Sequence, residues 1–147
     1  NIVRLRLSPD GKHLFFWAAG PEGGLFRLTL ADEKAKRILK LPGVHLRGRG
    51  GIDYEWSPDL KWIAYTTRTG SGSYNIWVIP YEGGKPENIT KLNAFHSQAR
   101  WSPDGKHIGF GSDRYGNFDV CSTVEIVGET HDTYFLRNVS CTTMAYC

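Results

Sequence analysis

The sequence repeats one five-residue phrase three times, and this repetition constrains the fold more than any other feature. The copies are Ser8-Pro9-Asp10-Gly11-Lys12, Ser57-Pro58-Asp59-Leu60-Lys61 and Ser102-Pro103-Asp104-Gly105-Lys106. The spacing between them is about 45 to 50 residues, a length typical of repeated supersecondary units. The chain is therefore expected to be an array of similar units rather than one irregular domain.

Each copy of the phrase stands in the same context. A large apolar residue precedes the serine, and an alternating run follows the lysine at residues 13–16, 62–65 and 107–110. Alternation with a period of two predicts a strand that buries one face. We expect that face to carry two residues in each unit: Leu14 and Phe16, Ile63 and Tyr65, and Ile108 and Phe110.

Two further strands complete the repeated unit. A third strand aligns at residues 25–28, 76–79 and 120–123, and a fourth aligns at 36–39 and 87–90. Units of four short antiparallel strands at this spacing are typical of β-propeller blades. The sequence predicts an all-β fold, a β-propeller fragment with about three four-stranded blades. Blade 1 and its connecting loop take residues 1–52, blade 2 takes 53–97, and a partial blade 3 takes 98–123. Residues 124–147 form a divergent tail that the repeat does not assign.

The phrase itself predicts a tight turn between two strands. Proline presets φ for the first corner, aspartate suits the second, and glycine takes the left-handed position that follows. Leu60 stands where the other copies have glycine, so we expect a distorted turn there. Structural roles are accordingly assigned to Ser8, Pro9, Asp10, Gly11, Trp56, Ser57, Pro58, Asp59, Trp101, Ser102, Pro103, Asp104 and Gly105.

These motifs carry a family resemblance over roughly residues 4–120. An apolar residue, then S-P-D-G-K, then a short apolar strand resembles the TolB-like (WD40-like, PD40-type) propeller repeat. The segment Asn75-Ile76-Trp77-Val78-Ile79-Pro80 with Gly83-Gly84 is similar to the propellers of tricorn-like serine peptidases. The resemblance implies a non-catalytic scaffold for protein or peptide recognition. The parent protein is then either a tricorn-like peptidase whose propeller filters substrates, or a TolB-like module of the cell envelope with no enzyme attached. It also implies a periplasmic or exported location.

The residues themselves offer little chemistry. No nucleophile elbow, Walker loop, dinucleotide fingerprint or H-E-x-x-H motif occurs, so we expect no catalytic residue, metal or cofactor in this chain. Asp53 and Glu55, on a predicted channel-lining strand, leave a carbohydrate-active or lyase-type propeller open. The net charge is only +3 and the charged residues are interspersed along the chain, which favours neither a nucleic-acid nor a membrane surface. The odd count of three cysteines gives no disulfide framework.

A recognition surface is predicted on the connecting loops. Loops that join the second strand to the third, and each blade to the next, are expected to emerge on one face. Arginine and aromatic side chains on such loops are typical of binding surfaces. Two interpretations of these side chains remain open: they contact an acidic group, such as a peptide carboxyl terminus, or they are simply solvated near the mouth of a channel. The residues concerned are His45, Arg47, Arg49, Arg68, His96, Arg114 and Tyr115.

The number of repeats bears on assembly. The chain carries two complete units and most of a third, whereas a closed propeller has typically 4–8 blades. We therefore expect the chain to be part of a longer protein. Unpaired strand edges of an open blade array predict self-association.

Overall fold

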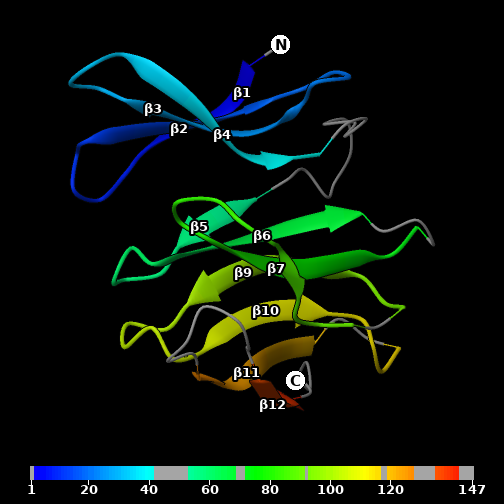
Figure 1. The fold of residues 1–147 in the computed structure, drawn as a ribbon. Coiled ribbons are helices and arrows are strands. Elements are labelled where there is room, and N and C mark those ends of the chain that lie inside the picture. The colour runs from blue at the N-terminus through cyan, green and yellow to red at the C-terminus, as the bar shows by residue number, and fades with distance from the viewer. Residues whose placement is uncertain are drawn as a thin grey trace.

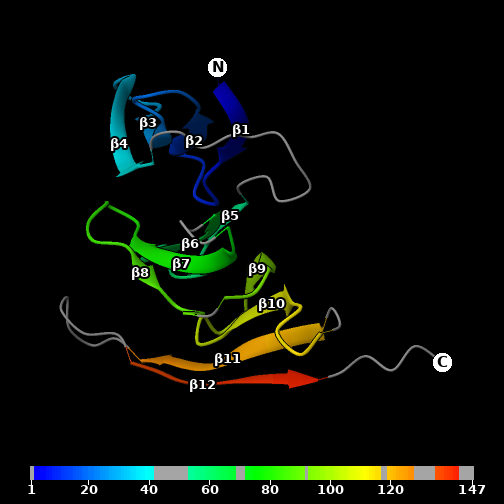
Figure 2. The same cartoon turned by 90° about the vertical axis from the view of Figure 1, so that its right-hand side faces the viewer.

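The computed structural model describes residues 2–41, 53–68, 72–91, 93–116, 119–127 and 135–142. These residues form three four-stranded antiparallel sheets, and none of them lies in a helix. The three sheets are stacked in chain order, and each sheet faces the next (Figure 1 and Figure 2). The predicted all-β propeller arrangement is confirmed.

Each sheet keeps its strands in chain order. Blade 1 consists of β1 (Ile2–Leu7), β2 (His13–Ala18), β3 (Gly24–Thr29) and β4 (Lys34–Lys40). Blade 2 consists of β5 (Tyr54–Trp56), β6 (Trp62–Arg68), β7 (Tyr74–Pro80) and β8 (Glu87–Asn88). Blade 3 consists of β9 (His96–Trp101), β10 (Ile108–Ser112), β11 (Asp119–Val127) and β12 (Phe135–Thr142). Strand β12 lies in the tail that the repeat left unassigned, and it completes the third sheet.

The repeated phrase closes a small hydrogen-bonded loop between the first two strands of each blade. The Ser8 hydroxyl donates to Asp10 Oδ1 at 2.5 Å and accepts the His13 N–H at 2.9 Å, while Asp10 Oδ1 accepts the Lys12 N–H at 3.1 Å. The same three contacts recur in the copies that begin at Ser57 and Ser102. The Ser8 hydroxyl, followed by the Lys12 amide, lowers the pKa of Asp10. The phrase recurs because serine and aspartate together satisfy the turn's backbone groups.

Leu60 takes the left-handed conformation that glycine has in the other copies. Its φ is 56°, against 69° at Gly11 and 71° at Gly105. Its amide donates to the Ser57 carbonyl at 2.9 Å, the distance also found in both glycine copies. The expected distortion of this turn was wrong. The Leu60 side chain packs against the core between blades 1 and 2, which offsets a left-handed cost of about 1–2 kcal/mol.

The core lies between the sheets. We call the side of a blade that faces the preceding blade its front face, and the opposite side its back face. Two apolar clusters fill the two junctions between blades, and each joins a back face to the next front face. The first contains Phe15, Trp17 and Leu25 from blade 1 with Tyr54, Trp56, Ile63, Tyr65 and Ile79 from blade 2. The second contains Ala64, Ile76 and Val78 from blade 2 with Ile108 and Phe110 from blade 3.

The predicted buried alternation is confirmed in blades 2 and 3 and differs in blade 1. Ile63 and Ile108 are fully buried, whereas Leu14 and Phe16 are only half-buried. In blade 1 the fully buried residues are instead Phe15 and Trp17, on the opposite side of β2. Blade 1 has a neighbour on its back face alone in the described structure, so its front-facing residues remain partly exposed.

A disulfide supports the sheet of blade 3. Cys121 is disulfide-bonded, and the register of β11 and β12 places Cys141 directly opposite it. The cysteine count did not indicate this bond, because an odd number carries no pairing information. Only the pairing of the two strands places Cys141 opposite Cys121.

Replacing Gly11 by alanine should destabilise the chain by about 1–2 kcal/mol, because Gly11 has φ of 69° and an added Cβ meets no atom. The cost is thus conformational and not steric. Chemical denaturation with a Lys12→Ala control, at the exposed neighbouring position, measures it. Equal stability of the two variants would contradict the left-handed requirement.

Alkylation under non-reducing conditions should modify one of the three cysteines, since Cys121 and its partner are protected. The variant Cys121→Ser should expose a second reactive thiol, which intact-mass spectrometry counts directly. Modification of all three cysteines in the folded parent chain would show that the bond does not form.

Candidate functional site

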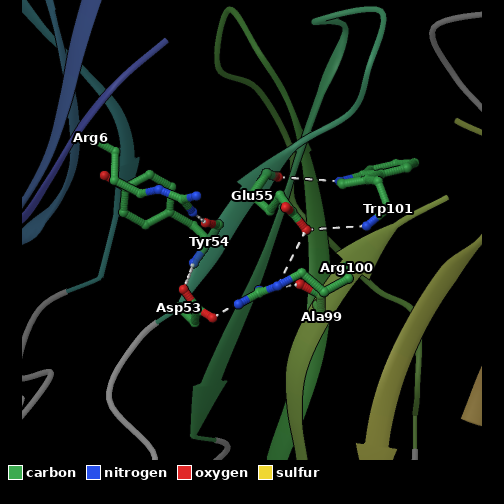
Figure 3. A network of polar contacts seen from close by, with 7 residues as sticks. All are labelled: Arg6, Asp53, Tyr54, Glu55, Ala99, Arg100 and Trp101. Atoms are coloured by element: carbon green, nitrogen blue, oxygen red, sulfur yellow. Dashed lines mark hydrogen bonds and ion pairs between the residues drawn. The ribbon is translucent and has the colours of Figure 1, made fainter. Parts of the chain in front are cut away.

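The innermost strands of neighbouring blades are joined by a polar network (Figure 3). Arg100 Nη1 on β9 donates to Asp53 Oδ2 at 3.0 Å, and Arg100 Nε lies 3.9 Å from Glu55 Oε2. Glu55 Oε2 also accepts the Trp101 N–H at 3.2 Å, and the Trp101 indole donates to the Glu55 carbonyl at 3.2 Å. Both carboxylates therefore hold blade 3 to blade 2, a structural use that weighs against a glycosidase-type acid pair at these two residues.

A second set of contacts joins blade 1 to blade 2. Arg6 Nη1 donates to the Tyr54 carbonyl at 2.5 Å, and its guanidinium lies 5.1 Å from the Trp56 ring centroid. The Tyr54 hydroxyl donates to the Arg4 carbonyl at 2.7 Å. Burial raises the pKa of Tyr54 above its ordinary value, so the phenol stays protonated and donates. The innermost strands are therefore held to their neighbours at both junctions between blades.

The outer part of the first junction carries a bidentate ion pair. Arg27 on β3 contacts both carboxylate oxygens of Glu82, at 2.5 and 2.9 Å. The Arg27 guanidinium is buried beside the Tyr81 ring, 5.3 Å from its centroid. The hydrogen bond from Arg27 lowers the pKa of Glu82. Planar, bidentate pairing of this kind orients the two blades as well as attracting them.

A groove of about 580 Å³ lies at one end of blades 2 and 3. It is built by the β6–β7 loop, the connection from β8 to β9, and the β10–β11 loop. The prediction that both loop classes share one face is confirmed at this groove. Its lining residues are Gly72, Ser73, Asn93, Ala94, Phe95, Asp113, Arg114 and Gly116.

Hydrogen bonds fix the groove before any ligand arrives. The Phe95 N–H donates to Asp113 Oδ1 at 2.7 Å, and the Asp113 N–H donates back to the Phe95 carbonyl at 3.2 Å. On the other side, the Tyr74 N–H donates to the Ala94 carbonyl at 3.3 Å. The Ser73 hydroxyl donates to Asn93 Oδ1. The connection between the blades is thus tied to the loops on both sides of it.

The structure brings some of the predicted recognition residues to this groove. Arg114 lines it, and the Arg68 guanidinium lies beside Gly72, where an added Cβ would come within 3.3 Å of Nη2. Tyr115 is 68% exposed, with the Arg114 guanidinium 5.8 Å from its ring centroid. Three further predicted residues, His45, Arg47 and Arg49, lie outside the described residues. Ser73 and Asn93 were not predicted, because only the packing of two blades brings their segments together.

His96, also predicted for this surface, is instead fully buried. Its ring meets Phe110 edge to face at a centroid distance of 5.5 Å. Burial, with a smaller contribution from Arg114 and an opposing one from Asp113, lowers the pKa of His96 to about 4. Neither ring nitrogen has a hydrogen-bond partner within the described part of the chain. His96 is therefore a neutral ring beneath the groove, and it presents no surface to a partner.

Two other kinds of site were sought among the described residues. They contain no group of three or more histidine, cysteine, aspartate or glutamate side chains able to hold a metal ion. The same residues include no helix long and apolar enough to cross a bilayer.

Three four-stranded sheets packed face to face define this chain as part of a β-propeller. No known family model matches it. Among curated relatives, an uncharacterized protein of Agrobacterium fabrum is 32% identical over 115 residues, which is 78% of this chain and 37% of the relative. The Tol-Pal system protein TolB of Alcanivorax borkumensis is 27% identical over 92 residues, 62% of this chain and 20% of that protein. The chain thus spans between 20% and 37% of the length of these two relatives.

Solved structures agree with these relatives. A TolB candidate from Agrobacterium tumefaciens superposes with a TM-score of 0.60 at 29% identity, over 84% of this chain and 42% of that one. The tricorn protease superposes with a TM-score of 0.66 at 20% identity, over 88% of this chain and 14% of that one. The chain consists of TolB-like β-propeller repeats and covers part of a propeller.

The buried His96 should make stability depend on pH between about 6.5 and 4. Its folded pKa lies below the unfolded value, so unfolding takes up a proton as the pH falls, and the folded state loses up to about 3 kcal/mol across this range. Denaturation of the parent chain and of His96→Leu from pH 7 to 4.5 measures the difference. The turn aspartates stay ionised there, because the pKa values of Asp10 and Asp104 are lowered. Parallel profiles for the two proteins would contradict the burial of a neutral histidine.

Proposed function

We propose that this propeller segment is a non-catalytic recognition scaffold that binds a protein or peptide partner through an acidic group in the groove between blades 2 and 3. The observation that carries the proposal is the position of Arg114 in a groove whose walls are fixed by hydrogen bonds. Because the loops that form the groove are already ordered, they lose little freedom when Arg114 binds a carboxylate.

The chemistry of the lining supports a peptide over a smaller anion. Ser73 and Asn93 offer hydroxyl and amide groups, and Phe95 offers apolar surface next to the Tyr74 ring, 4.9 Å away between centroids. Asp113 contributes a carboxylate, which accepts the Phe95 N–H. Aromatic surface combined with arginine is the composition that protein interfaces favour.

For the parent protein we infer a substrate-filtering propeller of a tricorn-like serine peptidase. The likeness to the tricorn protease supports this inference. The second candidate is a TolB-like cell-envelope interaction module with no enzyme attached, supported by the relatives that carry the name TolB. In both cases the described residues position a partner and perform no bond chemistry. A serine-peptidase domain in the full reading frame distinguishes the first from the second.

We also infer an exported, periplasmic location. The disulfide at Cys121 supports it independently of the relatives, since disulfides persist in oxidising compartments and are rare in the cytosol. Fractionation of cells expressing the full-length protein tests the location.

Binding should weaken when the arginine in the groove is removed. We expect Arg114→Ala to lower the affinity for a peptide with a free carboxyl terminus by about tenfold or more, because a charge-assisted hydrogen bond contributes about 1.5–3 kcal/mol. Fluorescence anisotropy with a peptide library, each member in free-acid and amidated form, measures the effect.

Two controls make the result specific. Arg37→Ala removes an equally charged residue on β4, far from the groove, where its partner is Glu22, and it should leave binding unchanged. Amidated peptides should bind the parent chain and Arg114→Ala alike. Equal loss for both peptide forms would show that Arg114 does not read a carboxylate, and no binding of any peptide would reject the recognition role.

A further inference from the structure

The groove between blades 2 and 3 places an aromatic residue beside its arginine. Phe95 and Arg114 both line the groove. The Phe95 N–H donates to Asp113 Oδ1 at 2.7 Å, the Phe95 carbonyl accepts the Asp113 N–H at 3.2 Å, and Arg114 follows Asp113 directly in the chain. Phe95 and Arg114 therefore stand on adjoining segments that hydrogen bonds hold together.

Phe95 is also supported from the side of blade 2. Tyr74, at the start of β7, forms a parallel bridge with Phe95, and the Tyr74 N–H donates to the Ala94 carbonyl at 3.3 Å. The two rings are tilted by 51°, with their centroids 4.9 Å apart. Phe95 is only half-buried, so part of its surface remains accessible. A ligand in the groove therefore meets an aromatic side chain whose backbone is already ordered on both sides.

The last residue of a peptide carries its carboxylate and its side chain on one Cα atom. A site that binds both groups must therefore offer a cation and a surface for the side chain next to each other. Arg114 and Phe95 meet this requirement. Among the described residues that line the groove, Phe95 has the only large apolar side chain, and the others are glycine, alanine, polar or charged.

We propose that Phe95 sets the specificity of the groove, so that Arg114 binds the terminal carboxylate of a peptide whose last side chain is aromatic or large and aliphatic. This specificity rests on the proposed function and adds the class of the last residue. Such a side chain covers the accessible part of Phe95 and removes apolar surface from water. A basic side chain instead meets the like charge of Arg114, and an acidic one meets that of Asp113.

Peptides that differ only in their last residue test this specificity. The last residue is phenylalanine, leucine, glycine, glutamate or lysine, the preceding positions are randomised, and each set is made in free-acid and amidated form. Fluorescence anisotropy with the full-length protein should show free acids ending in phenylalanine or leucine binding about tenfold or more tightly than those ending in glycine. Phe95→Ala should remove this preference and leave the affinity for glycine-ending peptides unchanged.

Two further variants separate specificity from stability. Phe26→Ala deletes another half-buried ring, which stacks on Phe16 in blade 1 away from the groove, and it should keep the preference. Phe95→Leu retains an apolar side chain at the groove and should keep the preference as well, even where Phe95→Ala folds poorly. Circular dichroism of each variant shows whether the blades remain folded.

The outcomes distinguish this inference from the function on which it rests. Free acids that bind alike whatever their last residue, or most tightly with glutamate or lysine, would overturn the specificity and leave the carboxylate site standing. A preference that survives Phe95→Ala would overturn the role of Phe95. Equal binding of free acids and amides, with the apolar preference intact, would overturn the role of Arg114 and leave Phe95 as the contact. No binding of any peptide would reject both.

Discussion

Face-to-face packing of neighbouring sheets is the constraint on which the rest of this structure depends. A single four-stranded sheet cannot bury both of its faces, so each blade relies on the next for its apolar surface. Blade 2 satisfies the constraint on both sides, with Ile63 covered by blade 1 and Ile76 by blade 3. Arginine contacts then fix the angle between blades: Arg6 and Arg27 at the first junction, and Arg100 at the second. The loops owe their positions to this framework, since the groove exists only where two blades are held side by side.

The repeated phrase and the packing solve different problems. The serine, aspartate and left-handed residue satisfy the backbone within one hairpin, and they need no help from other blades. This local closure explains why the turn tolerates Leu60 in place of glycine, because the same hydrogen bonds form at both. Polar contacts between the innermost strands instead hold neighbouring blades together. Asp53 and Glu55, which the sequence alone leaves open as catalytic acids, make such contacts between blades 2 and 3.

Much of the fold could be predicted because its signals are local. Alternation around Ile63 and Ile108, and the turn phrase beside them, depend on neighbouring residues alone and indicated the correct strands. The features that escaped prediction depend on residues far apart in the chain. Cys141 comes to lie opposite Cys121 only after β11 and β12 pair, and the half-exposed Phe16 reflects the absence of a neighbour on that face in the described structure. The groove combines three segments, so sequence reasoning found Arg114 by residue type, missed Ser73 and Asn93, and assigned the buried His96 to the surface.

The central position of blade 2 has a consequence for how the chain opens. In an array where each unit touches only its neighbours, stability is approximately the sum of unit and junction contributions. Blade 2 takes part in both junctions, whereas blades 1 and 3 each take part in one within the described structure. Amide hydrogens of β6 and β7 therefore exchange with solvent only through the largest openings, and those of the outer blades exchange through smaller, partial ones. In a segment made of these three blades alone, this graded protection makes the middle blade the last part to lose its native structure.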